Sequence, residues 1–119
     1  MDSTKRKKYI QGWKKRIKNK NIKREKSAEN AMKKAKKIAQ ILKTHYNIEK
    51  VILFGSLAEN NFRMESDIDL ALVNSDKSQY LEMYNKIYDI ASPYKVDLLP
   101  LEEASENLKK RISSKGVEL

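Results

Sequence analysis

The chain has 119 residues, with 26 lysines and arginines against 16 aspartates and glutamates, which gives a net charge of +10 at neutral pH. This length suits one domain, and apolar runs such as Val51–Phe54 are far shorter than the roughly 20 residues that cross a bilayer. The lack of cysteine and the single histidine exclude disulfide scaffolds, zinc ribbons, thiol nucleophiles and multi-histidine metal sites within one chain. Because the basic N-terminus has no apolar segment typical of secretory signals, we expect a cytoplasmic protein without a membrane anchor.

Positive charge is concentrated at the N-terminus. Residues 1–37 hold 16 lysines and arginines against 3 acidic residues, a net charge of +13, whereas residues 38–119 have a net charge of −3. We therefore expect a basic helical leader over residues 1–24 and one domain over residues 25–119. Such asymmetry indicates an anionic partner, such as nucleic acid or an acidic protein surface. The alternative is a solvated helix coated with lysines.

Two helical patterns begin the chain. In the leader, apolar residues recur every three or four positions among lysines, which predicts a cationic helix with a narrow apolar stripe. Such a stripe either covers its own domain or meets a partner. Ser27 is a suitable N-cap for a second helix, which we expect to reach about Thr44 or Tyr46 with its alanines toward a sheet. The residues of the leader stripe are Tyr9, Ile10, Trp13 and Ile17.

The remaining chain alternates strand and helix patterns. Buried strands are predicted over 51–54, 67–73 and 95–99, and the first is followed by a turn or short helix. A helix is predicted over 78–91, with Tyr80, Tyr84, Ile87, Tyr88 and Ala91 on its apolar face. A last short helix begins near Leu101 and ends at Gly116. This order predicts an α/β (α+β) domain in which helices cover a small mixed sheet.

Two aspartates open the second predicted strand. Asp67 and Asp69 are two residues apart, so their side chains should leave the same face of that strand. The strand is apolar on both faces beyond them, which is typical of an interior strand. Adjacent ionised carboxylates repel and lose solvation in such a place, and a divalent cation is the natural compensator. Mg²⁺ is favoured, because it binds one or two carboxylates together with water and substrate phosphates.

Gly55 and Ser56 come directly after the first buried strand. Glycine lets the backbone approach a ligand closely. The adjacent N–H groups, the serine hydroxyl and a helix N-terminus together suit an anion. Ten residues separate Ser56 from Asp67, so one element can hold phosphates while the next holds a metal ion. This combination is what phosphoryl-type transfer requires.

A third carboxylate, Asp97, lies within the third predicted strand. If that strand lies beside the strand of Asp67, Asp97 either ligates a second metal ion or accepts the proton of an attacking hydroxyl. Each feature alone has an ordinary explanation, since Gly-Ser often forms a simple turn and a lone aspartate often pairs with a lysine. Their combination in the predicted strand context favours an active site.

This pattern of a strand, Gly-Ser, ten residues, Asp-x-Asp and a distant third aspartate resembles the nucleotidyltransferase superfamily related to DNA polymerase beta, over residues 28–119. More narrowly, the chain is similar to the minimal nucleotidyltransferases, the MNT antitoxins encoded beside HEPN-domain toxins. That similarity includes the leader and the segments 96–104 and 115–119. The resemblance implies the nucleotidyltransferase fold and a Mg²⁺-dependent transfer of AMP from ATP to a hydroxyl. In the antitoxin branch, the acceptor is a tyrosine of the partner HEPN ribonuclease, which the modification silences.

The resemblance also implies roles for single residues. Asp67, Asp69 and Asp97 would hold two Mg²⁺ ions and ATP, while Gly55 and Ser56 would bind the β- and γ-phosphates. One departure concerns the loop after Ser56, where many family members have the sequence GSRARG. Two arginines are replaced here by Leu57 and Glu59, and Arg63 in the same loop is a candidate substitute.

Three other functions stay open at this point. The first alternative is a non-catalytic antitoxin that neutralises its partner by occlusion, with the leader as a clamp. The second is a small-molecule nucleotidyltransferase. The latter enzymes generally add a second domain, for which this chain is short. Direct binding of nucleic acid through the leader is the third alternative, and it predicts an affinity that falls steeply with salt.

Overall fold

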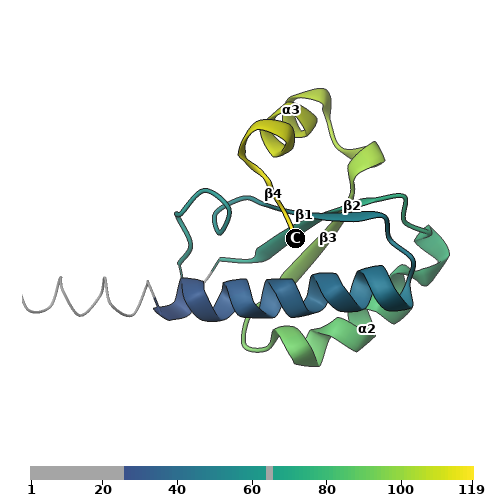
Figure 1. Cartoon of the computed structure of the whole chain (residues 1–119), viewed down its shortest axis with the longest axis horizontal. Helices are drawn as coiled ribbons and strands as arrows, with labels where there is room; N and C mark the ends of the chain where they lie inside the picture. Colours follow the sequence, from purple (N-terminus) through teal and green to yellow (C-terminus); the bar gives the residue numbers. More distant parts are fainter. Residues whose placement is uncertain (1–25, 64–65) are drawn as a thin grey trace, which may run out of the picture.

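The computed structural model describes residues 26–63 and 66–119 as an α/β fold with helices on both faces of one sheet (Figure 1). The predicted leader over residues 1–24, with its apolar stripe, lies outside the described residues, so the two-part division of the chain stays a prediction. No helix in the described ranges is long and apolar enough to cross a membrane.

The sheet has four strands in the order β3-β2-β1-β4. They are β1 (Lys50–Phe54), β2 (Ile68–Val73), β3 (Val96–Pro100) and β4 (Val117–Glu118). Strand β1 is antiparallel to β2 and β4, whereas β2 and β3 are parallel. The predicted mixed sheet is confirmed, with Asp67 lying one residue before β2 rather than within it. Strand β4 was not predicted, because two exposed residues carry no readable pattern.

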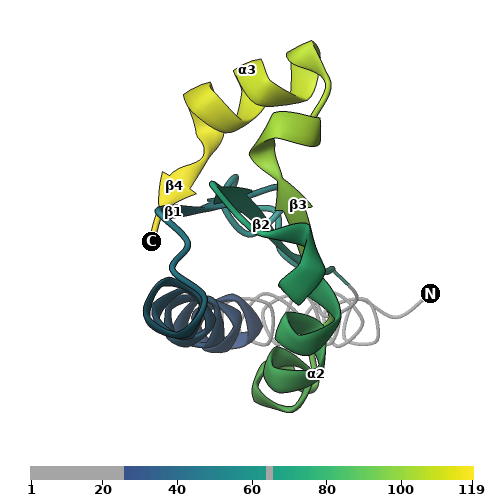
Figure 2. The same cartoon turned by 90° about the vertical axis from the view of Figure 1, so that its right-hand side faces the viewer.

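The main hydrophobic core lies on one side of this sheet. The helix of residues 26–45 and α2 (Tyr80–Ala91) cover that side, while α3 (Glu106–Lys115) lies on the other (Figure 2). The predicted inward alanines Ala31, Ala35 and Ala39 are buried, and they belong to one cluster with apolar residues of β1 and β2. Small side chains let this helix approach the sheet closely, which explains its alanine spacing.

Ser27 does not cap the helix of residues 26–45. Residue 26 is already helical, and Ser27 is buried within the first described turn, where its hydroxyl forms a hydrogen bond of 3.2 Å with the Tyr94 hydroxyl. Lys34 of the same helix reaches toward α2. Its ammonium donates to the carbonyl of Ile90 at 3.1 Å and to that of Ser92, and these contacts tie the helix to the end of α2.

The segment predicted as one helix over 78–91 begins with a short 3-10 helix, Lys77–Gln79, before α2. Asp76 accepts a hydrogen bond from the Ser78 N–H at its start. The buried face of α2 consists of Met83, Ile87 and Ala91. Tyr88 is 76% exposed, so its assignment to the apolar face was wrong. Met83 lies on the buried face instead and is fully buried.

Helix α3 is fixed against the sheet at its C-terminal end. A 3-10 helix, Leu101–Glu103, comes first, and the Ser105 hydroxyl then accepts from the Leu108 N–H as the N-cap of α3. The predicted stop at Gly116 is confirmed. A Cβ at Gly116 would clash with the carbonyl of Ile112 and the side chain of Ile52 on β1, so only glycine lets the chain turn back onto the sheet here.

Candidate functional site

A row of side chains crosses the sheet on the face toward α3. Asp69 on β2 lies opposite Asp97 on the parallel strand β3 and opposite Phe54 on the antiparallel strand β1. Neighbouring Ile68 and Leu70 are fully buried in the helix-covered core, and side chains alternate along a strand. Asp69 and Asp97 therefore leave the sheet on the same face, at adjacent positions.

The carboxylates of this row repel one another. Burial, followed by the charges of Asp97 and Asp67, raises the pKa of Asp69 to about 6. Asp67 and Asp97 are exposed, whereas Asp69 is half-buried. The charges of Asp67 and Asp97 thus act on Asp69, and Asp69 and Asp97 are in direct register. The convergence of all three carboxylates on one metal site stays a prediction.

Gly55 places the turn after β1 directly against Asp69. Its φ of +75° lies in the left-handed region, and a Cβ at this position would overlap Oδ2 of Asp69. Both the conformation and the space require glycine. Of the turn or short helix predicted here, the structure has turns over residues 56–60, in which Gly55 O accepts from Glu59 N–H at 3.1 Å and Ser56 O from Asn61 N–H at 2.8 Å.

A pocket of about 440 Å³ opens between this turn and α3. Arg111 and Lys115, which are one helical turn apart on α3, bring two cationic side chains to it. Sequence analysis missed both residues. Their i, i+4 spacing indicates a shared helix face, but only the folded structure shows which turn that face meets. The pocket is lined by Phe54, Gly55, Ser56, Glu59, Asn61, Leu108, Arg111 and Lys115.

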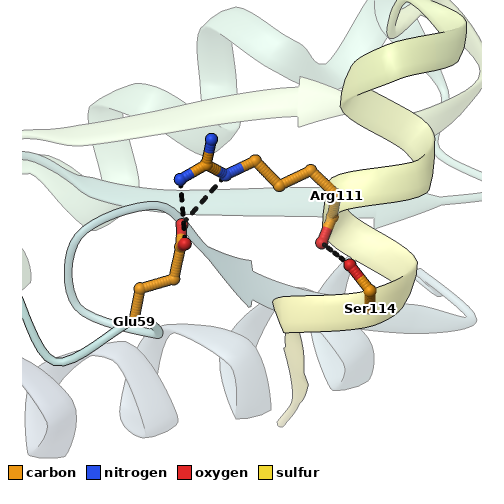
Figure 3. Close-up of polar contacts among 3 residues, drawn as sticks. All are labelled: Glu59, Arg111 and Ser114. Atoms are coloured by element: carbon orange, nitrogen blue, oxygen red, sulfur yellow. Dashed lines mark hydrogen bonds and ion pairs between the residues drawn. The ribbon is translucent and has the colours of Figure 1, made fainter.

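Glu59 and Arg111 form a two-pronged ion pair within this lining (Figure 3). Arg111 Nε donates to Oε2 at 3.2 Å and Nη2 donates to Oε1 at 2.8 Å, and the hydrogen bonds and charge of Glu59 raise the pKa of Arg111. Arg111, rather than the candidate Arg63, is thus the arginine that reaches the pocket. Arg63 is exposed and is not among the pocket residues.

Tyr84 of α2 supports the edge strand that carries Asp97. Its hydroxyl accepts a hydrogen bond of 2.8 Å from the Leu98 N–H. Burial raises the pKa of Tyr84, and the nearby charge of Asp97 raises it further, against the opposing effect of the Leu98 hydrogen bond. Strand β3 is at the edge of the sheet, so its outer N–H would otherwise lack a strand partner. Tyr84 therefore holds β3 at the residue next to Asp97.

The side chains at this site suit Mg²⁺, which also takes ligands from water and phosphate, better than a metal ion that is bound by side chains alone. Within residues 26–63 and 66–119, no three histidine, cysteine or acidic side chains are grouped so as to hold a metal ion by themselves. Asp69 and Asp97 nevertheless bring two carboxylates together, and repulsion between them is relieved by a cation. Mg²⁺ typically binds one or two carboxylates and takes its other ligands from water and substrate phosphates, so the residues present fit that ion.

The sequence from residue 36 to residue 119 matches the profile of the family described as "Polymerase beta, Nucleotidyltransferase". The chain belongs to this nucleotidyltransferase family. Among individual proteins, it is 44% identical over 43 residues to a Methanocaldococcus jannaschii protein named "Putative protein adenylyltransferase MJ1547". That match spans 34% of this chain and only 35% of the relative.

Solved structures of MNT antitoxins share this nucleotidyltransferase fold. One, the crystal structure of a toxin–antitoxin with AMP-PNP, matches at 27% identity with a TM-score of 0.59, covering 71% of this chain and 70% of that chain. Another, a tri-AMPylated Shewanella oneidensis HEPN toxin in complex with its MNT antitoxin, matches at 25% identity with a TM-score of 0.54, covering 74% and 70%. The crystal structure of "a putative nucleotidyltransferase from Sulfolobus solfataricus", at 23% identity and a TM-score of 0.51 over 78% of this chain and 82% of that chain, shares the fold.

Proposed function

We propose that this nucleotidyltransferase moves AMP from ATP to a tyrosine hydroxyl of a partner HEPN ribonuclease in the cytoplasm and thereby acts as its antitoxin. The observation that carries this proposal is the register of Asp69 beside Asp97 with the Gly55 turn packed against Asp69. Two further findings support it: a solved relative was crystallised with AMP-PNP, and another is in complex with an AMPylated HEPN toxin.

The proposed step is an in-line displacement at the α-phosphorus of ATP. The acceptor oxygen forms a bond to that phosphorus, the bond from phosphorus to the oxygen that bridges the α- and β-phosphates breaks, and pyrophosphate leaves with that oxygen. The hydroxyl proton passes to the carboxylate of Asp97, which is exposed at the edge strand and therefore open to a protein substrate. The N–H groups and hydroxyl of Gly55–Ser56 hold the leaving phosphates in line.

Asp67, Asp69 and Asp97 would hold two Mg²⁺ ions. Bound there, the metal supplies charge stabilisation for the phosphate oxygens. A carboxylate has two oxygens, so Asp97 can bind a cation through one and accept the proton through the other. Burial and the neighbouring carboxylates raise the pKa of Asp69 to about 6. A bound cation would offset this unfavourable environment of the ionised carboxylate.

Transfer of labelled AMP to the HEPN protein tests this function. The chain is incubated with α-labelled ATP, Mg²⁺ and a HEPN-domain ribonuclease from the same organism, and the labelled residue is mapped by mass spectrometry. We expect a labelled tyrosine with the wild type and a loss of about 100-fold or more with Asp69→Asn or Asp97→Asn. Asp89→Asn, at an exposed position of α2, is the matched control and should retain activity. Full transfer by the Asp69→Asn/Asp97→Asn double variant would refute the proposal.

Neutralisation by occlusion is the second candidate, because solved relatives are complexes with their toxins and the leader of this chain is strongly cationic. The same double variant separates the candidates. If it still silences the ribonuclease in a cleavage assay at equal protein ratio, binding alone suffices. If silencing is lost while a pull-down shows that the complex persists, AMP transfer is required.

A further inference from the structure

We propose that Arg111 and Lys115 of α3 bind the distal phosphates of ATP, as the cationic wall of the pocket that continues from the Gly55–Ser56 turn. This inference rests on the proposed function and assigns to α3 a part in substrate binding. Neither residue belongs to the strand–Gly-Ser–Asp-x-Asp pattern, and both stand on the last helix of the chain.

The position of the pocket supports a phosphate ligand. It shares Gly55 and Ser56 with the predicted anion-binding turn and continues from that turn to the two α3 cations. At about 440 Å³, it has the size of a small-molecule site. Lys115 is exposed, and a flexible ammonium that reaches into a pocket from its rim is a common point-charge contact to phosphate.

The charges on either side of Gly55 give the polyphosphate a direction. Asp69 lies directly behind Gly55, and Asp97 lies beside Asp69, so this side is acidic and repels phosphate unless a cation is bound. On the α3 side, Arg111 and Lys115 outnumber the single carboxylate of Glu59. A triphosphate is therefore most stable with its α-phosphate toward the aspartates and its distal phosphates toward α3.

Glu59 fixes the guanidinium in this arrangement. The carboxylate is only 19% exposed, whereas the Arg111 side chain is 66% exposed, so the guanidinium is held from the protein side and remains open to solvent. The Glu59 bonds use Nε and Nη2, which leaves the Nη1 edge directed elsewhere. A guanidinium anchored in this way loses less side-chain freedom when a phosphate binds.

Comparison of three ligands tests this assignment directly. The affinities of the full chain for ATP, AMP and inorganic triphosphate are measured by calorimetry with Mg²⁺ present and no acceptor protein. We expect Arg111→Ala and Lys115→Ala each to weaken binding of ATP and triphosphate by about five- to tenfold, as for loss of one charge-assisted contact. AMP lacks the two distal phosphates, so its affinity should change less than twofold. Lys110→Ala removes the same charge from an exposed position of α3 outside the pocket lining and should leave all three affinities unchanged.

Each outcome of this comparison decides the inference. Equal loss of ATP and AMP affinity would place the nucleoside in this pocket and overturn the assignment, and so would unchanged ATP affinity in both variants. In either case AMP transfer by the wild type would leave the proposed function intact. Binding of triphosphate through Arg111 and Lys115 without any AMP transfer would support the pocket and refute the function. Failure of the wild type to bind ATP and triphosphate would refute both. Thermal melting of each variant confirms that the folded state is compared, and Arg111→Lys, which keeps the charge, should recover part of the ATP affinity.

Discussion

The two faces of the sheet differ in what they contribute. The face toward the helix of residues 26–45 and α2 is closed and apolar, with Ile68, Leu70 and Leu72 fully buried. The face toward α3 carries Asp69 and Asp97 side by side, and a pocket separates the Gly55 turn from α3. Stability is therefore concentrated on the first face, and groups that disfavour the folded state lie on the second. Substitutions in the buried core and at the paired aspartates should therefore have opposite effects on stability.

Truncation of the closed face should have the largest effect. Leu70 is fully buried, and Leu70→Ala should lower the free energy of unfolding by about 3 kcal/mol through lost burial and the cavity left behind. The change in the free energy of unfolding is measured by urea denaturation, monitored by circular dichroism. Val73→Ala, at a partly exposed position of the same strand, is the control and should lower the free energy of unfolding much less. Equal losses would mean that the two faces are not energetically distinct.

Neutralisation of the open face should have the opposite sign. In the folded state the pKa of Asp69 is about 6, above its ordinary value of 3.8, so folding favours the protonated carboxyl. The contribution of Asp69 to stability is therefore most favourable below about pH 4 and is lost as pH rises through 6, where the folded state must hold a charge that it disfavours. Asp69→Asn should raise the free energy of unfolding at pH 8 by about 1–2 kcal/mol, a figure discounted for partial exposure.

Urea denaturation at pH 4 and pH 8 in the presence of a chelator checks this prediction. The gain from Asp69→Asn should be present at pH 8 and nearly absent at pH 4, whereas Asp89→Asn, on the exposed surface of α2, should show no such difference. A loss of stability in Asp69→Asn at pH 8 would mean that the carboxylate is compensated within the protein. Because the same substitution is expected to abolish AMP transfer, it separates stability from activity on this face.

The comparison of faces also shows how far the sequence specifies the site. The three main strands and Asp67, Asp69 and Asp97 were located from alternation and from short apolar runs, because those signals depend on neighbours within a few residues. The pocket wall could not be located from the sequence, because Glu59 and Arg111 are 52 residues apart in the chain. Their contact depends on how α3 docks through Gly116 against Ile52, which no local pattern encodes.

The same limit explains the errors within helices. Helical spacing placed Tyr88 with the apolar residues of α2, but the sheet selects a face centred on Met83 and Ile87. Ser27 has the chemistry of an N-cap, yet it lies within the helix and bonds to Tyr94. In both cases the residue type allowed two positions, and packing against a distant segment decided between them.

The Tyr84 hydroxyl at the edge of the sheet should give a smaller effect on stability. Tyr84→Phe removes the acceptor of the Leu98 N–H and should lower the free energy of unfolding by about 1 kcal/mol. It should also lower the rate of AMP transfer several-fold with little change in the KM for ATP, because Asp97 adjoins Leu98. Tyr80→Phe, on the same helix as Tyr84, breaks a hydrogen bond to Ser75 and serves as control. It should cost similar stability without the change in rate, and equal rates in the two variants would limit Tyr84 to a structural role.

The ion pair on the open face should have the smallest effect on stability, because Arg111 is largely in solvent. Glu59→Gln should lower the melting temperature slightly, and the difference should shrink in 1 M NaCl, where charges are screened within about 3 Å. Glu106→Gln, which breaks the exposed pair of Glu106 and Lys109 at 3.6 Å, provides the reference. The two-pronged geometry of Glu59 and its low exposure should make its loss the larger of the two. If the two variants lower the melting temperature equally, Glu59 does not immobilise Arg111. The ion pair with Glu59 would then give Arg111 no advantage over Lys115 in binding phosphate.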